Sequence, residues 1–297
     1  MNNNRITINN DFLTVQINPH GACLTSVCET GEEGPIEYLW QGDSAYWAEQ
    51  APNLFPYVGR LTMGSYQLDN KMYQMDIHGF AKDSLFDVIM VHKDKAVFAM
   101  RDDSRTYAQY PYHFQLEIIY QLTGKRLDVT FKVENWDEKE MYFGIGGHPG
   151  FNVPIEKDLR FEDYFLEFAE DCHPKQICFS TDHFVEGEPI PYVLSCERIL
   201  PLTHELFDED ALVLTDMPRR ITLRSRKGKK ALSVNFPEMD YVGLWHAPRT
   251  DAPYVCIEPW ATLPSRKGIV EDLATQPGLV RLGSGESFSN VWNIEIC

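Results

Sequence analysis

The sequence is poor in basic side chains, with 27 Lys and Arg against 44 Asp and Glu among its 297 residues and a net charge of −17. A surface this acidic repels nucleic acid phosphates and anionic lipids, so we expect neither as a partner. No apolar run approaches the roughly 20 residues that a membrane-spanning helix needs. The opening stretch MNNNRITINN lacks the apolar segment of a secretion signal. These absences predict a soluble, cytoplasmic protein.

The common cofactor and metal motifs are also missing. The seven cysteines form no C-x-x-C pair, and their odd number and scattered positions indicate free thiols in a reducing compartment. The histidines show no H-x-x-x-H or carboxylate spacing typical of a zinc site. There is no glycine-rich phosphate loop, no G-x-S-x-G and no dinucleotide fingerprint. We therefore expect no metal and no cofactor.

Long helical patterns are absent as well, and the dominant period is two. Helical signals are brief, at Ser44–Gln50, Asp103–Tyr110 and Thr203–Asp208. The strand signals are short, rich in β-branched and aromatic residues, and bounded by Gly, Asn, Asp or Pro. The expected strands are RITI, LTVQI, LFDVIMV, KAVFAM, HFQLEIIYQL, RLDVTFKVEN, RRITLRS, ALSVNF, PYVCIEP and FSNVWNIEI. This pattern predicts one all-β domain over residues 1–297, an antiparallel sandwich or barrel, with a loop-rich excursion at 172–200.

One histidine lies in an unusual setting, in GIGGHPGFNVP from Gly144 to Pro154. The glycines on both sides of His148 allow positive φ or a close backbone approach. Pro149 biases His148 towards an extended conformation. Such a segment can aim one imidazole into a cavity. The competing interpretation is a core or turn histidine that is held by backbone hydrogen bonds.

Glu258 follows an apolar, β-rich run in YVCIEPWATLPS. We expect Pro259 to stop the ladder and to leave the Glu258 carboxylate at a strand end. Partial burial there would raise the pKa of Glu258 and make it a better base. The alternative is a glutamate on the rim, in a surface ion pair.

Three further polar residues are candidates for binding. YQLDNKMYQM predicts a hairpin that turns at Asp69-Asn70, and Arg60 and His78 lie at similar distances before and after that turn. Strand pairing would bring Arg60 and His78 together as two donors for hydroxyl groups, unless both face water. Asp210 follows an acidic patch and starts an apolar alternation, a position that alone favours a helix cap or a surface role.

Four stretches together carry a family resemblance. NLFPYVGRL, IHGFAKD, GGHPGFNVP and CIEPW, in this order, resemble the aldose 1-epimerase (galactose mutarotase-like) superfamily, and most of all its LacX-type branch. The resemblance covers nearly the whole chain, from about Ile6 onward. It implies a β-supersandwich with few short helices and an isomerase that interconverts the anomers of a hexose.

The resemblance also implies roles for particular residues. His148 takes the position of the family's catalytic acid and Glu258 that of its catalytic base. The implied sugar-binding residues are Arg60, His78, Asp210 and Trp245.

Other activities remain open at this point. One branch of the superfamily acts on hexose 6-phosphates, and Lys82 in HGFAK takes a basic position of its motif. A non-catalytic sugar-binding protein could use the same scaffold. A glycoside hydrolase would need two carboxylates, for which Asp210 is the partner candidate of Glu258. In each case the expected partner is a small aldose sugar, and the protein is expected to be a monomer or a homodimer.

Overall fold

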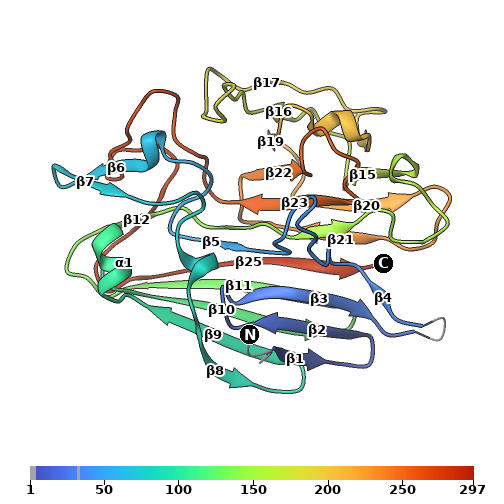
Figure 1. Ribbon diagram of the computed structural model, residues 1–297, viewed down its shortest axis with the longest axis horizontal. Helices are drawn as coiled ribbons and strands as arrows, with labels where there is room; N and C mark the ends of the chain where they lie inside the picture. The colour runs from blue at the N-terminus through green and yellow to red at the C-terminus, as the bar shows by residue number, and fades with distance from the viewer. Residues whose placement is uncertain (1–4, 32–33) are drawn as a thin grey trace.

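The computed structural model describes residues 5–31 and 34–297, and its strands pair in antiparallel sheets (Figure 1). The predicted all-β fold is confirmed. Each of the ten predicted strands is present, the first of them beginning at Ile6. Met1–Asn4, the start of the stretch that was expected to carry no secretion signal, lie outside the described residues.

The largest sheet has nine strands and ends at an edge strand, β8. In spatial order its strands are β18 (Ile199–Pro201), β15 (Tyr164–Phe168), β20 (Arg220–Ser225), β21 (Leu232–Asn235), β25 (Ser287–Ile296), β11 (Arg126–Asn135), β10 (Phe114–Thr123), β9 (Lys95–Arg101) and β8 (Asp87–Val91). Figure 1 shows the long strands β25, β11, β10 and β9 lying side by side. In β11, the apolar residues at alternate positions from Leu127 to Val133 are buried, as period-two patterning requires.

An eight-stranded sheet carries the residues of functional interest. Its strands are β17 (Ile190–Pro191), β16 (Lys175–Gln176), β19 (Leu212–Thr215), β22 (Tyr241–Trp245), β23 (Tyr254–Trp260), β13 (Gly146–Gly147) and β5 (Asn53–Leu54), with β14 (Gly150–Asn152) also paired to β23. β23 is buried along its whole length. One of its faces packs into the main core through Val255 and Ile257, and the other carries Cys256, Glu258 and Trp260.

Three smaller sheets complete the fold. They are formed by β1 (Ile6–Asn9), β2 (Leu13–Asn18), β3 (Cys23–Glu29) and β4 (Ile36–Glu37); by β6 (Ser65–Leu68) and β7 (Lys71–Gln74); and by β12 (Met141–Phe143) and β24 (Val280–Leu282). β6 and β7 are the predicted hairpin, with Asp69 and Asn70 both at positive φ. The first sheet and the nine-stranded sheet share one core, to which Val15, Val27 and Phe131 belong.

The helical predictions met mixed outcomes. α1 (Ser104–Gln109) is confirmed, and Asp103 caps it by accepting a hydrogen bond from the Thr106 N–H. The segment 203–208 forms only the short 3₁₀ helix His204–Phe207. The predicted helix at Ser44–Gln50 is wrong: the segment is a tight turn, because the side chain of Asp43 accepts the N–H of Ala45. Further 3₁₀ turns lie at Thr62–Gly64, Ala81–Asp83 and Phe161–Asp163.

Among the described residues, no helix has the length and apolar character that crossing a membrane requires.

Candidate active site

The strand register brings His148 and Glu258 together. β13 pairs Gly146 with Trp260, and β14 pairs Gly150 with Cys256. Continued from either side, this register places His148 opposite Glu258, at the break between β13 and β14. Opposite residues of antiparallel strands have Cβ atoms about 4.5–5.5 Å apart, so their side chains meet. The distance from His148 Nε2 to Glu258 Oε2 is 3.3 Å.

Glu258 is more deeply placed than the sequence predicted. It is 1% exposed and lies inside β23, which continues through Pro259 to Trp260. The expected end of the ladder at Pro259 is wrong for a geometric reason. Ile257 and Ala261 donate their N–H groups to the carbonyls of Pro149 and Ile145, on the side of β23 that faces β13 and β14. Pro259 lies midway between them, so the N–H that it lacks would face that same side. The ladder to β22 on the other side is therefore intact.

The glycines around His148 serve close packing. Gly146, Gly147 and Gly150 do not have positive φ, so of the two expected uses the structure shows the close approach. A Cβ at Gly146 would lie 2.9 Å from the Trp260 ring, and one at Gly147 would lie 2.8 Å from the Trp292 ring. The His148 N–H is fixed by the carbonyl of Pro52. The segment thus holds the imidazole at one angle between indole rings.

Aromatic rings enclose the imidazole. Trp47 stacks on His148 with ring centroids 4.9 Å apart, and Trp245 meets it edge-on at 5.7 Å. Gly243 lies opposite Glu258 in β22, and a Cβ there would be 2.9 Å from the Trp260 ring. Gly243 therefore leaves room for the Trp260 indole beside the carboxyl group.

The predicted approach of Arg60 and His78 is confirmed, and both line the same cavity as His148. The N–H of His78 donates to the carbonyl of Gly59, and the N–H of Gly59 donates to His78 Nδ1 at 3.0 Å. These bonds hold His78 at φ +66°. Because Nδ1 accepts, the neutral ring carries its hydrogen on Nε2, which is free to donate. Arg60 forms no side-chain hydrogen bond or ion pair with any residue that the structure describes.

Asp210 organises another wall of the cavity. One of its carboxylate oxygens accepts a hydrogen bond from Trp245 Nε1 at 2.7 Å, and the other lies 2.9 Å from His183 Nδ1. His183 comes from the loop-rich excursion, which the sequence could not place. Trp245, expected at the pocket, is held there by Asp210.

Lys82 also lines the cavity, but its charge is partly countered. Its Nζ lies 2.9 Å from Asp83 Oδ2 and 3.5 Å from Glu49 Oε1. The ammonium group therefore already has two carboxylate neighbours.

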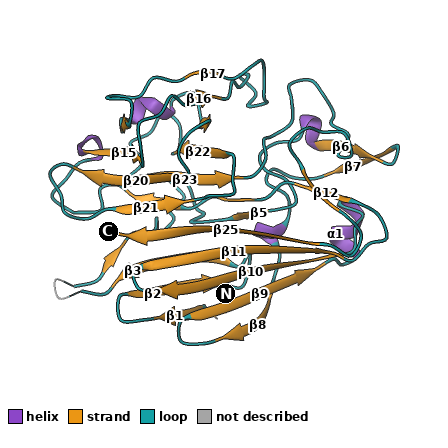
Figure 2. Cartoon of the chain, turned by 180° about the vertical axis from the view of Figure 1, so that it is seen from behind, coloured by secondary structure: helices purple, strands orange, loops and turns teal. Residues whose placement is uncertain are grey.

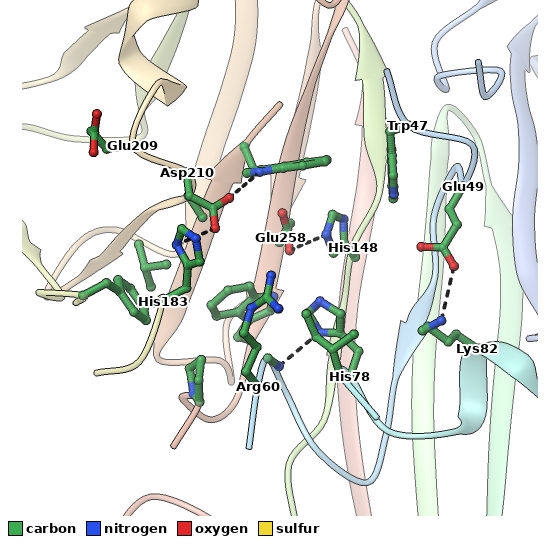
Figure 3. Close-up of a pocket in the computed structure, with 18 residues that line it drawn as sticks. Trp47, Glu49, Arg60, His78, Lys82, His148, His183, Glu209, Asp210 and Glu258 are labelled. Carbon is green, nitrogen blue, oxygen red and sulfur yellow. Dashed lines mark hydrogen bonds and ion pairs between the residues drawn. The ribbon is translucent and has the colours of Figure 1, made fainter. Parts of the chain in front are cut away.

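Together these residues surround a cavity of about 270 Å³, which is small for a ligand pocket and of a size for one monosaccharide (Figure 3). All seven residues singled out from the sequence line it. The sequence missed other lining residues, and of these Gly59, Ile77 and Trp260 lie in the family-like stretches. The missed residues include Trp47, Glu49, Phe179, His183, Glu209 and Trp260.

Burial shifts the two central groups towards their neutral forms. It raises the pKa of Glu258 well above its ordinary value, and the negative charge of Asp210 raises it further. Burial also lowers the pKa of His148 to about 3. The pair therefore holds one proton over a wide pH range. The pKa of His78 is likewise lowered by burial and by the nearby cationic groups, so its ring is neutral.

One group of side chains could hold a metal ion. Donor atoms of His148, Cys256 and Glu258 all lie within 4.8 Å of one another, in a combination that zinc can accept. Burial raises the pKa of the Cys256 thiol and of the Glu258 carboxyl group. A metal would therefore have to displace a proton from each.

The fold and the cavity define a class: a β-sandwich protein with a buried imidazole–carboxylate pair in a pocket of monosaccharide size. The chain belongs to the aldose 1-epimerase family, whose sequence model matches residues 4–272. It is therefore a carbohydrate epimerase-type protein, of the LacX type that the four stretches indicated.

Similar proteins agree in sequence and in structure. The chromosomal LacX protein of Lactococcus lactis subsp. lactis is 34% identical over 268 residues, which cover 87% of this chain and 88% of that protein. A galactose mutarotase related enzyme from Lactobacillus acidophilus superposes with a TM-score of 0.91 at 30% identity, covering 99% of this chain and 97% of the other. A galactose mutarotase-like protein from Lactobacillus casei ATCC 334 gives 0.92 at 30% identity, covering 99% and 100%.

Proposed function

We propose that the protein is an aldose 1-epimerase that interconverts the α and β anomers of a free hexose. Opening the ring requires that the C1 hydroxyl lose a proton while the ring oxygen gains one, so an acid and a base must act together. Glu258 takes the hydroxyl proton and His148 protonates the ring oxygen. The aldehyde then turns about the C1–C2 bond, and the two groups exchange roles as the ring closes.

The observation that carries this proposal is the 3.3 Å separation of His148 Nε2 and Glu258 Oε2 on the cavity wall. The hydroxyl oxygen and the ring oxygen of a pyranose are bonded to the same carbon. An acid and a base that serve both oxygens must therefore be close neighbours. Two groups on opposite sides of a wide cleft could not reach them in one step.

The shared proton fits this reaction. Ring opening needs one proton on the pair, held by His148 before the step and by Glu258 after it. Burial favours a neutral imidazole beside a protonated carboxyl group, which is the proton arrangement of the open-chain stage. In the resting site the proton is therefore held mainly on Glu258, and ring opening starts from the form in which that proton has moved to His148.

The other cavity residues have the chemistry to hold a sugar. His78 Nε2–H and the Arg60 guanidinium offer donors for hydroxyl oxygens. Trp47, Trp245 and Trp260 offer apolar faces on which the C–H surface of a pyranose can lie. These contacts exist with either anomer bound, so they serve binding more than the proton transfers.

A phosphorylated substrate is the second candidate, because Arg60 and Lys82 line the same cavity. The two carboxylates beside Lys82 oppose it, since a phosphate would have to compete with them. We therefore favour the unphosphorylated hexose.

Polarimetry tests the proposal and separates the alternatives. Freshly dissolved α-glucose, α-galactose and the corresponding 6-phosphates would be followed with enzyme and with buffer. Faster rotation change with a free hexose supports the proposal, and acceleration with a 6-phosphate alone assigns the second candidate. Binding of a sugar without acceleration would identify a sugar-binding protein. Release of reducing sugar from a disaccharide would identify a hydrolase.

A further inference from the structure

The edge strand β8 has an unpaired side. It pairs with β9 on one side only, and the other side makes no backbone hydrogen bond to any described residue from Asp87 to Val91. Figure 2 shows β8 at the outer limit of the molecule, away from β22 and β23 of the cavity. The free N–H and C=O groups of such an edge are a template for another strand.

The side chains of β8 make this edge unusual. Val88, Ile89, Met90 and Val91 follow one another and are all 40–54% exposed, and Leu85 just before them is 75% exposed. Soluble proteins normally protect sheet edges with charges or proline. A continuous apolar edge of this kind marks a contact surface.

The charges at the two ends of this edge are opposite. Asp87 begins β8 and forms no ion pair with any described residue, while Lys93 lies in the turn that follows the strand. Among the described residues, Asp11 is the one ion-pair partner of Lys93, at 3.9 Å, and both side chains are largely exposed. An antiparallel copy of the same edge would bring each Asp87 to the Lys93 of the other copy.

Symmetry and charge together select one register. Hydrogen-bonded and non-hydrogen-bonded pairs alternate along an antiparallel ladder. A two-fold axis maps each residue pair onto another pair of the same hydrogen-bonding type. Because the types alternate along the strand, this is possible only if the axis passes through one residue, which then faces its own copy. With Met90 on the axis, Ile89 faces Val91 and Asp87 faces Lys93. With Ile89 on the axis, Asp87 would face Val91 and lose its partner.

We propose that a second copy of this chain docks on β8, antiparallel across a two-fold axis at Met90, so that two nine-stranded sheets join into one. The bulge between Val88 and Met90 limits the length of a regular ladder. Burial of the apolar side chains therefore supplies much of the contact, and the paired charges at both ends set the register. The interface lies apart from the cavity, so it is independent of the proposed function.

Sedimentation velocity over a range of protein concentrations tests the proposal. The wild type should shift from monomer towards dimer as its concentration rises. Ile89→Lys places two ammonium groups near the axis and should give a monomer with unchanged mutarotase activity and melting temperature. Val193→Lys is the matched control, because Val193 is 88% exposed and lies outside this edge; it should leave the dimer intact.

Charge exchange tests the register. Asp87→Lys alone and Lys93→Asp alone each place like charges together twice per dimer, and each should raise the dimer Kd by about tenfold or more. The double variant Asp87→Lys/Lys93→Asp should return to within about threefold of the wild type. A wild type that is monomeric at about 1 mM would overturn the proposal. A dimer that survives Ile89→Lys, or a double variant that stays as weak as the single ones, would also overturn it.

Discussion

Replacing Glu258 by glutamine separates the chemistry of this residue from its place in the fold. The side chain is 1% exposed, and burial raises its pKa, so the folded protein already favours the uncharged carboxyl group. Glutamine has the same shape and no charge, but it cannot accept the proton of the C1 hydroxyl. We expect kcat to fall by about 10²–10⁴, which corresponds to about 2.7–5.4 kcal/mol in the barrier.

The same substitution should not cost stability. A carboxyl group whose pKa is raised on folding contributes stability below its unfolded pKa, and this contribution is lost as pH rises through the folded pKa. The wild type should therefore lose stability relative to Glu258→Gln as pH rises above about 4.5, the ordinary value of a glutamate. Thermal unfolding at pH 5 and pH 8 measures the difference, which should favour the variant at pH 8.

Polarimetry with saturating free hexose measures kcat, and Glu29→Gln is the matched control. Glu29 is also buried, but it pairs with Lys125 and Lys230 and does not line the cavity. Its loss should lower the melting temperature and leave kcat unchanged. The reasoning is refuted if Glu258→Gln keeps more than about a tenth of the wild-type kcat, since a positioned base is worth at least about 10². If Glu258→Gln failed to fold, the uncharged form assigned to the Glu258 carboxyl group would be refuted.

Three further predictions concern the surroundings of the pair. Asp210→Asn should move the high-pH limb of the kcat/KM profile to lower pH, because the negative charge of Asp210 raises the pKa of the Glu258 carboxyl group. The amide oxygen of the asparagine still accepts from Trp245 Nε1, and an unmoved limb would contradict this prediction. The low-pH limb should lie far below pH 6.5, the ordinary value of an imidazole, because burial lowers the pKa of His148 to about 3; a limb near 6.5 in steady-state kinetics would argue against this. Gly243→Ala should destabilise the protein by about 1–3 kcal/mol and reduce sugar affinity, because its Cβ would lie 2.9 Å from the Trp260 ring; denaturant unfolding and KM are the measurements, and no change in either would show that the ring moves freely.

Local patterns in the sequence were enough for the fold class and for the longest strands. Alternation of apolar residues located ten strands, and Asp69-Asn70 marked a hairpin because both residues adopt positive φ in the turn. The same local rules failed at Ser44–Gln50, where the backbone N–H of Ala45 donates to the Asp43 carboxylate and stabilises a turn instead of a helix. They also failed at Pro259, because the N–H that this proline lacks would face the break between β13 and β14, while the ladder to β22 on the other side of β23 stays intact.

The sequence by itself determined the period-two pattern, the family and the identity of seven cavity residues. It could bring Arg60 and His78 together because one hairpin joins them. Only the tertiary structure decided that Glu258 is fully buried opposite His148, that Asp210 holds Trp245 and His183, and that Glu49 approaches Lys82. These contacts join strands and loops that are far apart in the chain. Neither distance nor desolvation can be read from neighbouring letters, because both depend on which segments pack across the cavity.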